Sequence, residues 1–164
     1  MKIKKLILSC FGVGFLPLAP GTFASLLPLA AFLLCRYYCP VDIVALIFLV
    51  FAMIISSVLC LMFAGQAEKL EGEKDPSWIV IDEFAGQSIA LLPAALLSGS
   101  GKVVASAIAA FMLFRFLDIL KPPPIHEMQQ IDGGLGILID DLVAGIMIEN
   151  SSLIKYHFTG FVSL

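Results

Sequence analysis

Residues 43–64 form an uninterrupted apolar run that carries no charged side chain. A helix needs about 20 largely apolar residues to cross the hydrocarbon core of a bilayer. The run is long enough to do so, which restricts the chain to folds that keep such a segment away from water. The composition agrees, because 60% of the residues are hydrophobic and 14% are charged, whereas soluble domains carry about 25% charged residues.

Further apolar segments are expected to form helices of the same kind. Asp75 and Pro76 have the types of an N-cap and a first helical position, and a run of three prolines after Lys121 stops the helix before it. The expected helices besides residues 43–64 are residues 23–38, 76–97, 102–120 and 135–149. Residues 6–18 are apolar but interrupted by glycine and proline, so we expect a short or broken segment at the membrane surface.

The predicted fold is all-α. It is a compact polytopic helical membrane bundle of about five main hydrophobic helices plus the short N-terminal segment. The chain has 164 residues and no linker rich in glycine and serine, which favours a single domain over residues 1–164. A peripheral form of the same all-helical fold stays open, because residues 23–38 and 135–149 are short for membrane spans.

The distribution of positive charge predicts an orientation. Lys2, Lys4 and Lys5 give the chain a basic start, and with five spans more lysine and arginine residues fall on that side than on the other. The positive-inside rule then places the start on the cytoplasmic side of a multi-pass protein. The net charge of -3, without a basic stripe, excludes nucleic acid as an expected partner.

Ionisable residues inside the apolar segments fall near one end of the expected bundle, because successive spans run in opposite directions. At about 1.5 Å of rise per residue, they share one layer roughly 10 Å deep. They are Asp82, Glu83, Arg115, Asp118, Lys121, Asp140 and Asp141. Taken singly, an acid near a helix start is explained by a favourable contact with the helix dipole, and Arg115 with Asp118 by an i,i+3 ion pair. The whole group indicates a functional site, as intramembrane ionisable residues usually do.

Two glycines share a spacing with these acids. Gly86 follows Asp82 by four residues, and Gly145 follows Asp141 by four. Each glycine therefore lies on the helix face of one acid. Since small residues let helices approach closely, we expect these two helices to pack together and to bring their acidic pairs into contact.

Carboxylates gathered in one layer repel each other unless a cation joins them. Oxygen ligands without cysteine or histidine suit Mg²⁺ or Mn²⁺, and Mg²⁺ commonly shares its coordination with substrate phosphate. Arg115 and Lys121 suit phosphate binding. The pattern predicts metal-assisted phosphoryl chemistry at a membrane surface. The alternatives are an ion- or proton-coupled small membrane transporter subunit, whose acids would spread through the bilayer depth, a phosphoalcohol transferase, and a non-catalytic scaffold.

Four blocks of the sequence resemble the phosphatidylglycerophosphatase A family: PGTFASL from Pro20, IVIDEFAGQ from Ile79, FRFLDILKPPPI from Phe114 and GGLGILIDDLVAG from Gly133. Their order and approximate spacing follow the family along nearly the whole chain. The resemblance implies Mg²⁺-dependent hydrolysis of phosphatidylglycerophosphate to phosphatidylglycerol and inorganic phosphate. It also implies a phospholipid substrate and a place in the bacterial inner (cytoplasmic) membrane, with the site on the cytoplasmic side. The stretch HEMQQID at residues 126–132 departs from the family pattern.

The resemblance also implies roles for individual residues. The expected catalytic residues are Asp82, Glu83, Asp118, Asp140 and Asp141. A subset of Asp82, Glu83, Asp140 and Asp141 is expected to bind Mg²⁺, and Arg115, Lys121, Gly21 and Thr22 are expected to bind phosphate. Asp118 either orients Arg115 or completes the metal shell. The nucleophile is either activated water or an aspartate. His126 is an alternative general acid or a solvated loop residue.

Overall fold

The computed structural model describes residues 2–39, 41–123, 125–128 and 131–150, without the side chain of His126. Over these residues all regular structure is helical, so the all-α prediction is confirmed. The elements in order are α1 (Lys2–Leu8), the 3₁₀ turn η1 (Val13–Phe15), α2 (Pro20–Tyr38), α3 (Asp42–Glu71), α4 (Ile81–Ala90), α5 (Leu92–Ala95), α6 (Ser100–Leu120), α7 (Ile125–Met128) and α8 (Gly134–Asn150).

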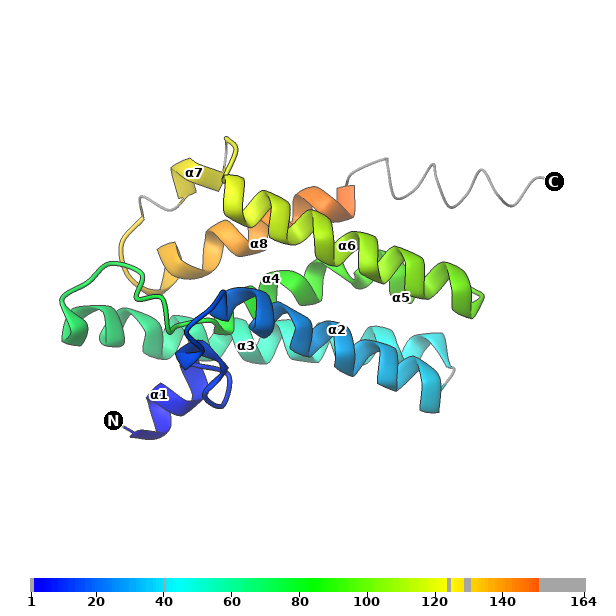
Figure 1. Ribbon diagram of the computed structural model, residues 1–164, viewed down its shortest axis with the longest axis horizontal. Coiled ribbons are helices and arrows are strands. Elements are labelled where there is room, and N and C mark those ends of the chain that lie inside the picture. Colours follow the sequence, from blue (N-terminus) through cyan, green and yellow to red (C-terminus); the bar gives the residue numbers. More distant parts are fainter. Residues whose placement is uncertain (1, 40, 124, 129–130, 151–164) are drawn as a thin grey trace.

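The longer helices run alternately in opposite directions along the molecule (Figure 1). α2 starts at one end and α3 returns to it, α4 and α5 lead away again, α6 returns, and α8 leads away. The starts of α2, α4 and α8 and the end of α6 therefore lie at the same end of the bundle. This is the arrangement that the sequence predicted for the ionisable residues.

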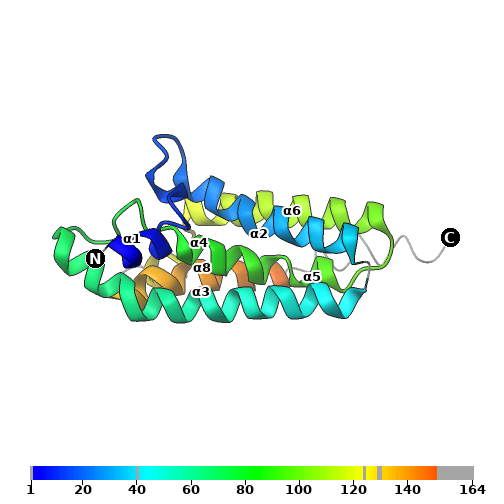
Figure 2. The same ribbon diagram turned by 90° about the horizontal axis from the view of Figure 1, so that it is seen from below.

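α4 and α8 form the interior of the bundle. In Figure 2 they lie between a layer made of α2 and α6 and the single helix α3. Almost every residue of α4 is buried, and so is most of one side of α8. α3 and α6 instead expose many large apolar side chains. α2, α3 and α6 are the helices, within the described residues, that are long and apolar enough to cross a membrane.

The segment predicted as one helix over residues 76–97 differs from that prediction. Its helix begins at Ile81 and not at Pro76, and Asp75 has a left-handed backbone (φ 51°) instead of the extended conformation of an N-cap. After Leu91 the chain continues as the short α5, in which Pro93 has no N–H to donate to the preceding turn. Asp82 and Glu83 consequently lie in the first turn of α4, where the helix dipole favours negative charge.

Two other boundaries bear on the site. α3 continues beyond residue 64 as far as Glu71 and ends where Gly72 adopts a left-handed backbone (φ 70°). Residues 6–18 are broken as expected, because α1 ends at Leu8 and left-handed residues precede η1. The backbone N–H of Val80 donates to the carbonyl of Leu8 over 2.9 Å, which ties the N-terminal segment to the residues just before α4.

Candidate active site

α4 and α8 pack with almost no side chain between them. A Cβ added at Gly86 would lie 2.5 Å from the carbonyl oxygen of Asp141, and one added at Gly145 would lie 2.5 Å from the carbonyl oxygen of Gly86. Only glycine fits at such separations. The predicted role of the two glycines is confirmed, because their contact brings the acidic first turns of α4 and α8 together.

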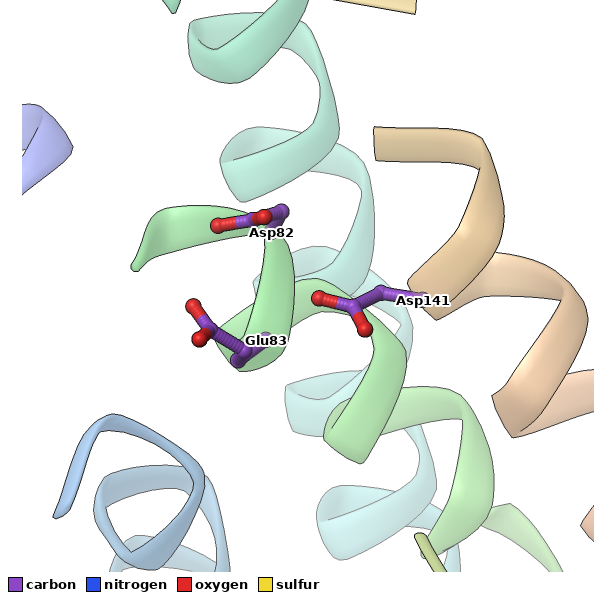
Figure 3. A group of neighbouring side chains, drawn as sticks. All are labelled: Asp82, Glu83 and Asp141. Carbon is purple, nitrogen blue, oxygen red and sulfur yellow. The ribbon is translucent and has the colours of Figure 1, made fainter. Parts of the chain in front are cut away.

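Asp82, Glu83 and Asp141 point toward one another from these two helices (Figure 3). Each offers a carboxylate oxygen, and the three oxygens lie within 4.8 Å of one another. Asp82 is 6% exposed and Asp141 is 3% exposed. Oδ1 of Asp82 and Oε2 of Glu83 are buried without a hydrogen-bond partner among the described residues. Since such oxygens are costly to bury, this donor set fits a hard divalent cation.

Asp140 lies beside this cluster and has other partners. Its Oδ2 accepts a hydrogen bond from Nζ of Lys121 over 2.7 Å, and its Oδ1 accepts one from the backbone N–H of Asp141 over 3.1 Å. Neighbouring residues on a helix point about 100° apart, so the two aspartates face different groups. The structure therefore gathers three of the four predicted metal ligands and places the fourth in an ion pair.

Arg115 is held by two side chains. Its Nη1 lies 2.8 Å from Oδ2 of Asp118 and donates to Oγ of Ser25 over 3.3 Å. Ser25 in turn donates to the carbonyl oxygen of Gly21 over 2.8 Å. This geometry matches the first of the two roles considered for Asp118, the orientation of Arg115. Ser25 is a site residue that the sequence analysis missed, although it belongs to the PGTFASL block.

One pocket of about 290 Å³ joins these groups at the end of the bundle. It contains carboxylates together with both predicted phosphate-binding cations, so it offers a metal site and an anion site side by side. Its lining residues are Ala19, Pro20, Gly21, Asp75, Ser77, Ile79, Asp82, Glu83, Arg115, Asp118, Lys121, Asp140 and Asp141.

The start of α2 contributes less to this pocket than predicted. Gly21 lines it, and a Cβ there would lie 2.1 Å from Oε1 of Glu83. Thr22 does not line it, and its backbone N–H donates to the carbonyl oxygen of Ala19 over 3.0 Å. The phosphate contact expected from this motif therefore rests on Gly21. His126 was considered as a general acid, and its side chain lies outside the described residues.

Strained backbone surrounds the pocket. Ala19, Asp75 and Lys121 line it and have φ values of 44°, 51° and 43°. Residues with a Cβ avoid this left-handed region, and such strain tends to gather at functional sites. Asp75 and Ser77 were not predicted as site residues, because the Asp-Pro pair was interpreted as a helix cap. Their position directly before an acidic helix start was the signal that could have identified them.

The ion pair of Lys121 determines its charge. Burial by itself would lower the pKa of Lys121, but the hydrogen bond to Asp140 and the surrounding carboxylates together raise this pKa above its ordinary value. Lys121 follows the last residue of α6, so its amine reaches the pocket from the end of that helix. Lys121 therefore keeps its positive charge at neutral pH.

Comparison with known proteins identifies relatives along most of the chain. Residues 6–154 match the phosphatidylglycerophosphatase A family. The chain is 37% identical over 140 residues to a putative phosphatidylinositol-3-phosphatase of Bacteroides thetaiotaomicron, which covers 83% of this chain and 82% of that protein. It is 37% identical over 138 residues to phosphatidylglycerophosphatase A of Escherichia coli, a match that covers 84% of this chain and 74% of that protein. It is 38% identical over 137 residues to the protein of that name from Haemophilus influenzae, a match that covers 83% of this chain and 78% of that protein. No solved structure matches the chain.

Proposed function

Because the chain belongs to the phosphatidylglycerophosphatase A family, we propose that it hydrolyses phosphatidylglycerophosphate to phosphatidylglycerol and inorganic phosphate with the help of Mg²⁺. The general class, a phosphatase acting on phosphoric monoesters, follows from the family itself. One observation carries the specific proposal: a single pocket holds buried carboxylate oxygens that have no hydrogen-bond partner among the described residues, beside Arg115 and Lys121.

The cation site is the acidic cluster between α4 and α8. Asp82, Glu83 and Asp141 would hold Mg²⁺, because their oxygens converge and two of them lack other partners among the described residues. When bound, Mg²⁺ supplies positive charge that offsets the charge developing on the transferred phosphoryl group. Gly21 supports this cluster from α2, since the absence of a side chain leaves room for the carboxylate of Glu83.

The remaining charge on the phosphate is met by the two cations. Arg115 presents a planar guanidinium suited to two phosphate oxygens, and Asp118 and Ser25 hold it in place. Lys121 adds a point charge and is positioned by Asp140. Groups that are already oriented before the reaction stabilise developing charge without reorganising. Asp118 and Asp140 therefore act mainly as positioning residues.

The reaction adds water across the bond between the terminal phosphorus and the glycerol oxygen. The phosphorus gains an oxygen, and the released glycerol oxygen takes up a proton to become the hydroxyl of phosphatidylglycerol. Two nucleophiles fit the pocket: a water molecule, or an aspartate that forms a phosphoenzyme before water attacks. Both routes use the same cations for the phosphate oxygens, so the roles of Arg115 and Lys121 do not depend on this choice.

The proposed side of the membrane is the cytoplasmic one. The pocket is lined by the first turns of α4 and α8. These helices start at the end of the bundle where α1 also lies (Figure 1), and α1 carries Lys2, Lys4 and Lys5. Lysines beside membrane segments favour the cytoplasmic side. A pocket at the end of the apolar helices lies at the depth where a phospholipid presents its headgroup, while the acyl chains remain in the bilayer.

The decisive experiment measures phosphate release from phosphatidylglycerophosphate in detergent micelles, with Mg²⁺ and with EDTA. The proteins are the wild type, Asp141→Asn, and Asp42→Asn as a matched control at the first turn of α3, at the other end of the bundle. We expect release that needs Mg²⁺, falls at least 100-fold in Asp141→Asn and persists in Asp42→Asn. Undiminished release in EDTA would overturn the metal proposal.

A second substrate tests which lipid phosphate the protein hydrolyses. One relative is named a putative phosphatidylinositol-3-phosphatase, so phosphatidylinositol 3-phosphate is assayed under the same conditions. Faster release from phosphatidylglycerophosphate supports the proposal. Release from the inositol lipid alone would assign the pocket to that substrate and would refute the proposed one.

A further inference from the structure

A second concavity of about 480 Å³ lies between α2 and α3, and its lining also includes Ile81 and Phe84 of α4 and Ile7, Cys10 and Phe11 of the N-terminal segment. Its lining is almost entirely apolar. The polar lining residues already have partners within the protein: Ser56 donates to the carbonyl oxygen of Ala52 over 2.6 Å, and Cys10 donates to that of Val80 over 3.6 Å. The groove thus suits a hydrocarbon ligand, since its polar groups need nothing from a ligand.

The groove and the acidic pocket share one helical turn. Ile81 and Phe84 of α4 line the groove, whereas Asp82 and Glu83, between them in sequence, line the pocket. Along α2, Gly21 lines the pocket and Leu27 lines the groove, a separation of about 9 Å at 1.5 Å per residue. The two places lie about 9 Å apart along α2 but on different faces of the first turn of α4, so a phospholipid that reaches both passes around that turn.

The direction and length of the groove also match a lipid chain. On α3 its lining extends from Leu59 to Phe48, or roughly 16 Å at 1.5 Å per residue. Since α3 runs toward the pocket end (Figure 1), Leu59 lies nearer the pocket and Phe48 lies farther from it. Half of a bilayer core of about 30 Å is about 15 Å, so the groove spans one leaflet.

Resting on the proposed function, we propose that this groove binds one acyl chain of the phospholipid substrate while the acidic pocket holds its terminal phosphate. Both walls, α2 and α3, are long and apolar enough to cross a membrane, so the groove opens toward the bilayer. Phe51 and Ile55 line it and are more than half exposed. A chain can thus enter sideways from the leaflet while its headgroup enters the pocket.

The test fills the groove without touching the acidic pocket. Ala52→Phe places a ring in the groove, Ala52→Leu is a smaller change, and Ala105→Phe adds the same bulk to an exposed position of α6 outside it. Each protein hydrolyses long-chain phosphatidylglycerophosphate and the deacylated headgroup, glycerophosphoglycerophosphate. We expect Ala52→Phe to raise KM for the long-chain lipid at least tenfold, Ala52→Leu to raise it less, and neither to change kcat/KM for the headgroup. An unchanged long-chain KM in Ala52→Phe would overturn the inference.

A binding measurement separates this inference from the proposed function. Phosphatidylglycerophosphate carrying a photoreactive diazirine in one acyl chain is crosslinked to the protein in vesicles, and the labelled peptides are identified by mass spectrometry. Labelling within residues 48–59 and 81–84 that disappears in Ala52→Phe but persists in Ala105→Phe supports the groove, even if the wild type releases no phosphate. Labelling spread evenly over α3 and α6, or equal labelling by a phosphatidylcholine probe, would refute it.

Discussion

Gly145 packs directly against the carbonyl oxygen of Gly86, so closely that a Cβ at Gly145 would lie 2.5 Å from that oxygen. The carbonyl oxygen of Asp141 lies equally close to the Cβ position of Gly86. Neither glycine carries chemistry, yet their contact sets the distance between α4 and α8. The convergence of Asp82, Glu83 and Asp141 depends on that distance.

Gly145→Ala should therefore separate the acidic first turns. We expect a loss of about 1–3 kcal/mol of stability from overpacking and a larger proportional loss of phosphate release, because the carboxylates move apart. Gly101→Ala in α6 is the matched control, since a Cβ there meets no atom within 4 Å. Thermal unfolding in detergent and the phosphate assay check both variants. Normal activity in Gly145→Ala would contradict the dependence of the site on this contact.

A divalent cation should stabilise the folded protein. Three carboxylates within 4.8 Å of one another repel when all are charged, and a ligand that binds only the folded state adds about 2.7 kcal/mol at 100 times its Kd. We expect Mg²⁺ to raise the unfolding temperature of the wild type and to leave that of Asp82→Asn nearly unchanged. The unfolding temperatures in calcium-free buffer, with and without EDTA, provide the baseline. An equal shift in both proteins would place the cation elsewhere.

Gly21→Ala should displace the carboxylate of Glu83, since the new Cβ would lie 2.1 Å from its Oε1. The expected result is a fall of about tenfold or more in phosphate release, which corresponds to at least about 1.4 kcal/mol, and a weaker response to Mg²⁺. Adding Glu83→Asp shortens the side chain and makes room for the methyl group. The double variant should be more active than Gly21→Ala alone, and a further loss of activity would contradict the steric explanation.

Asp140→Asn should change the pH dependence through Lys121. In the wild type the hydrogen bond to Asp140 helps to raise the pKa of Lys121, against the opposing effect of burial. Without that carboxylate the pKa falls, so Lys121 loses its proton at a lower pH. We expect phosphate release to be slower at neutral pH by at least about tenfold, in line with the loss of a charge-assisted hydrogen bond of about 1.5–3 kcal/mol. The alkaline limb should shift to lower pH.

The matched variant for that prediction is the double change of Asp140→Asn with Lys121→Arg. Arginine stays protonated throughout the range, so the alkaline limb caused by residue 121 should disappear from the profile of this double variant. A pH profile of kcat/KM between about pH 7 and pH 11 distinguishes the three proteins. Superimposable profiles for wild type and Asp140→Asn would mean that the charge of Lys121 does not limit the reaction.

Local patterns predicted much of this arrangement. The uncharged run at residues 43–64 required a long apolar helix, and α3 contains it. The four-residue spacing of Gly86 and Gly145 from their acids placed a small residue and a carboxylate on one helix face, and the helices do meet there. These predictions succeeded because helix periodicity and bilayer thickness act within a single segment.

Contacts between segments decided the rest. Sequence could not tell that Asp140 would pair with Lys121 while Asp141 joined Asp82 and Glu83, because that choice follows from how α8 is rotated against α4 and α6. It also could not place the start of α4 at Ile81, where residues before the helix are tied to Leu8 and bring Asp75 to the pocket. The sequence alone determined which residues are ionisable and near one end of apolar helices. Only the tertiary structure decided their partners, because rotation between packed helices depends on side-chain fit across distant parts of the chain.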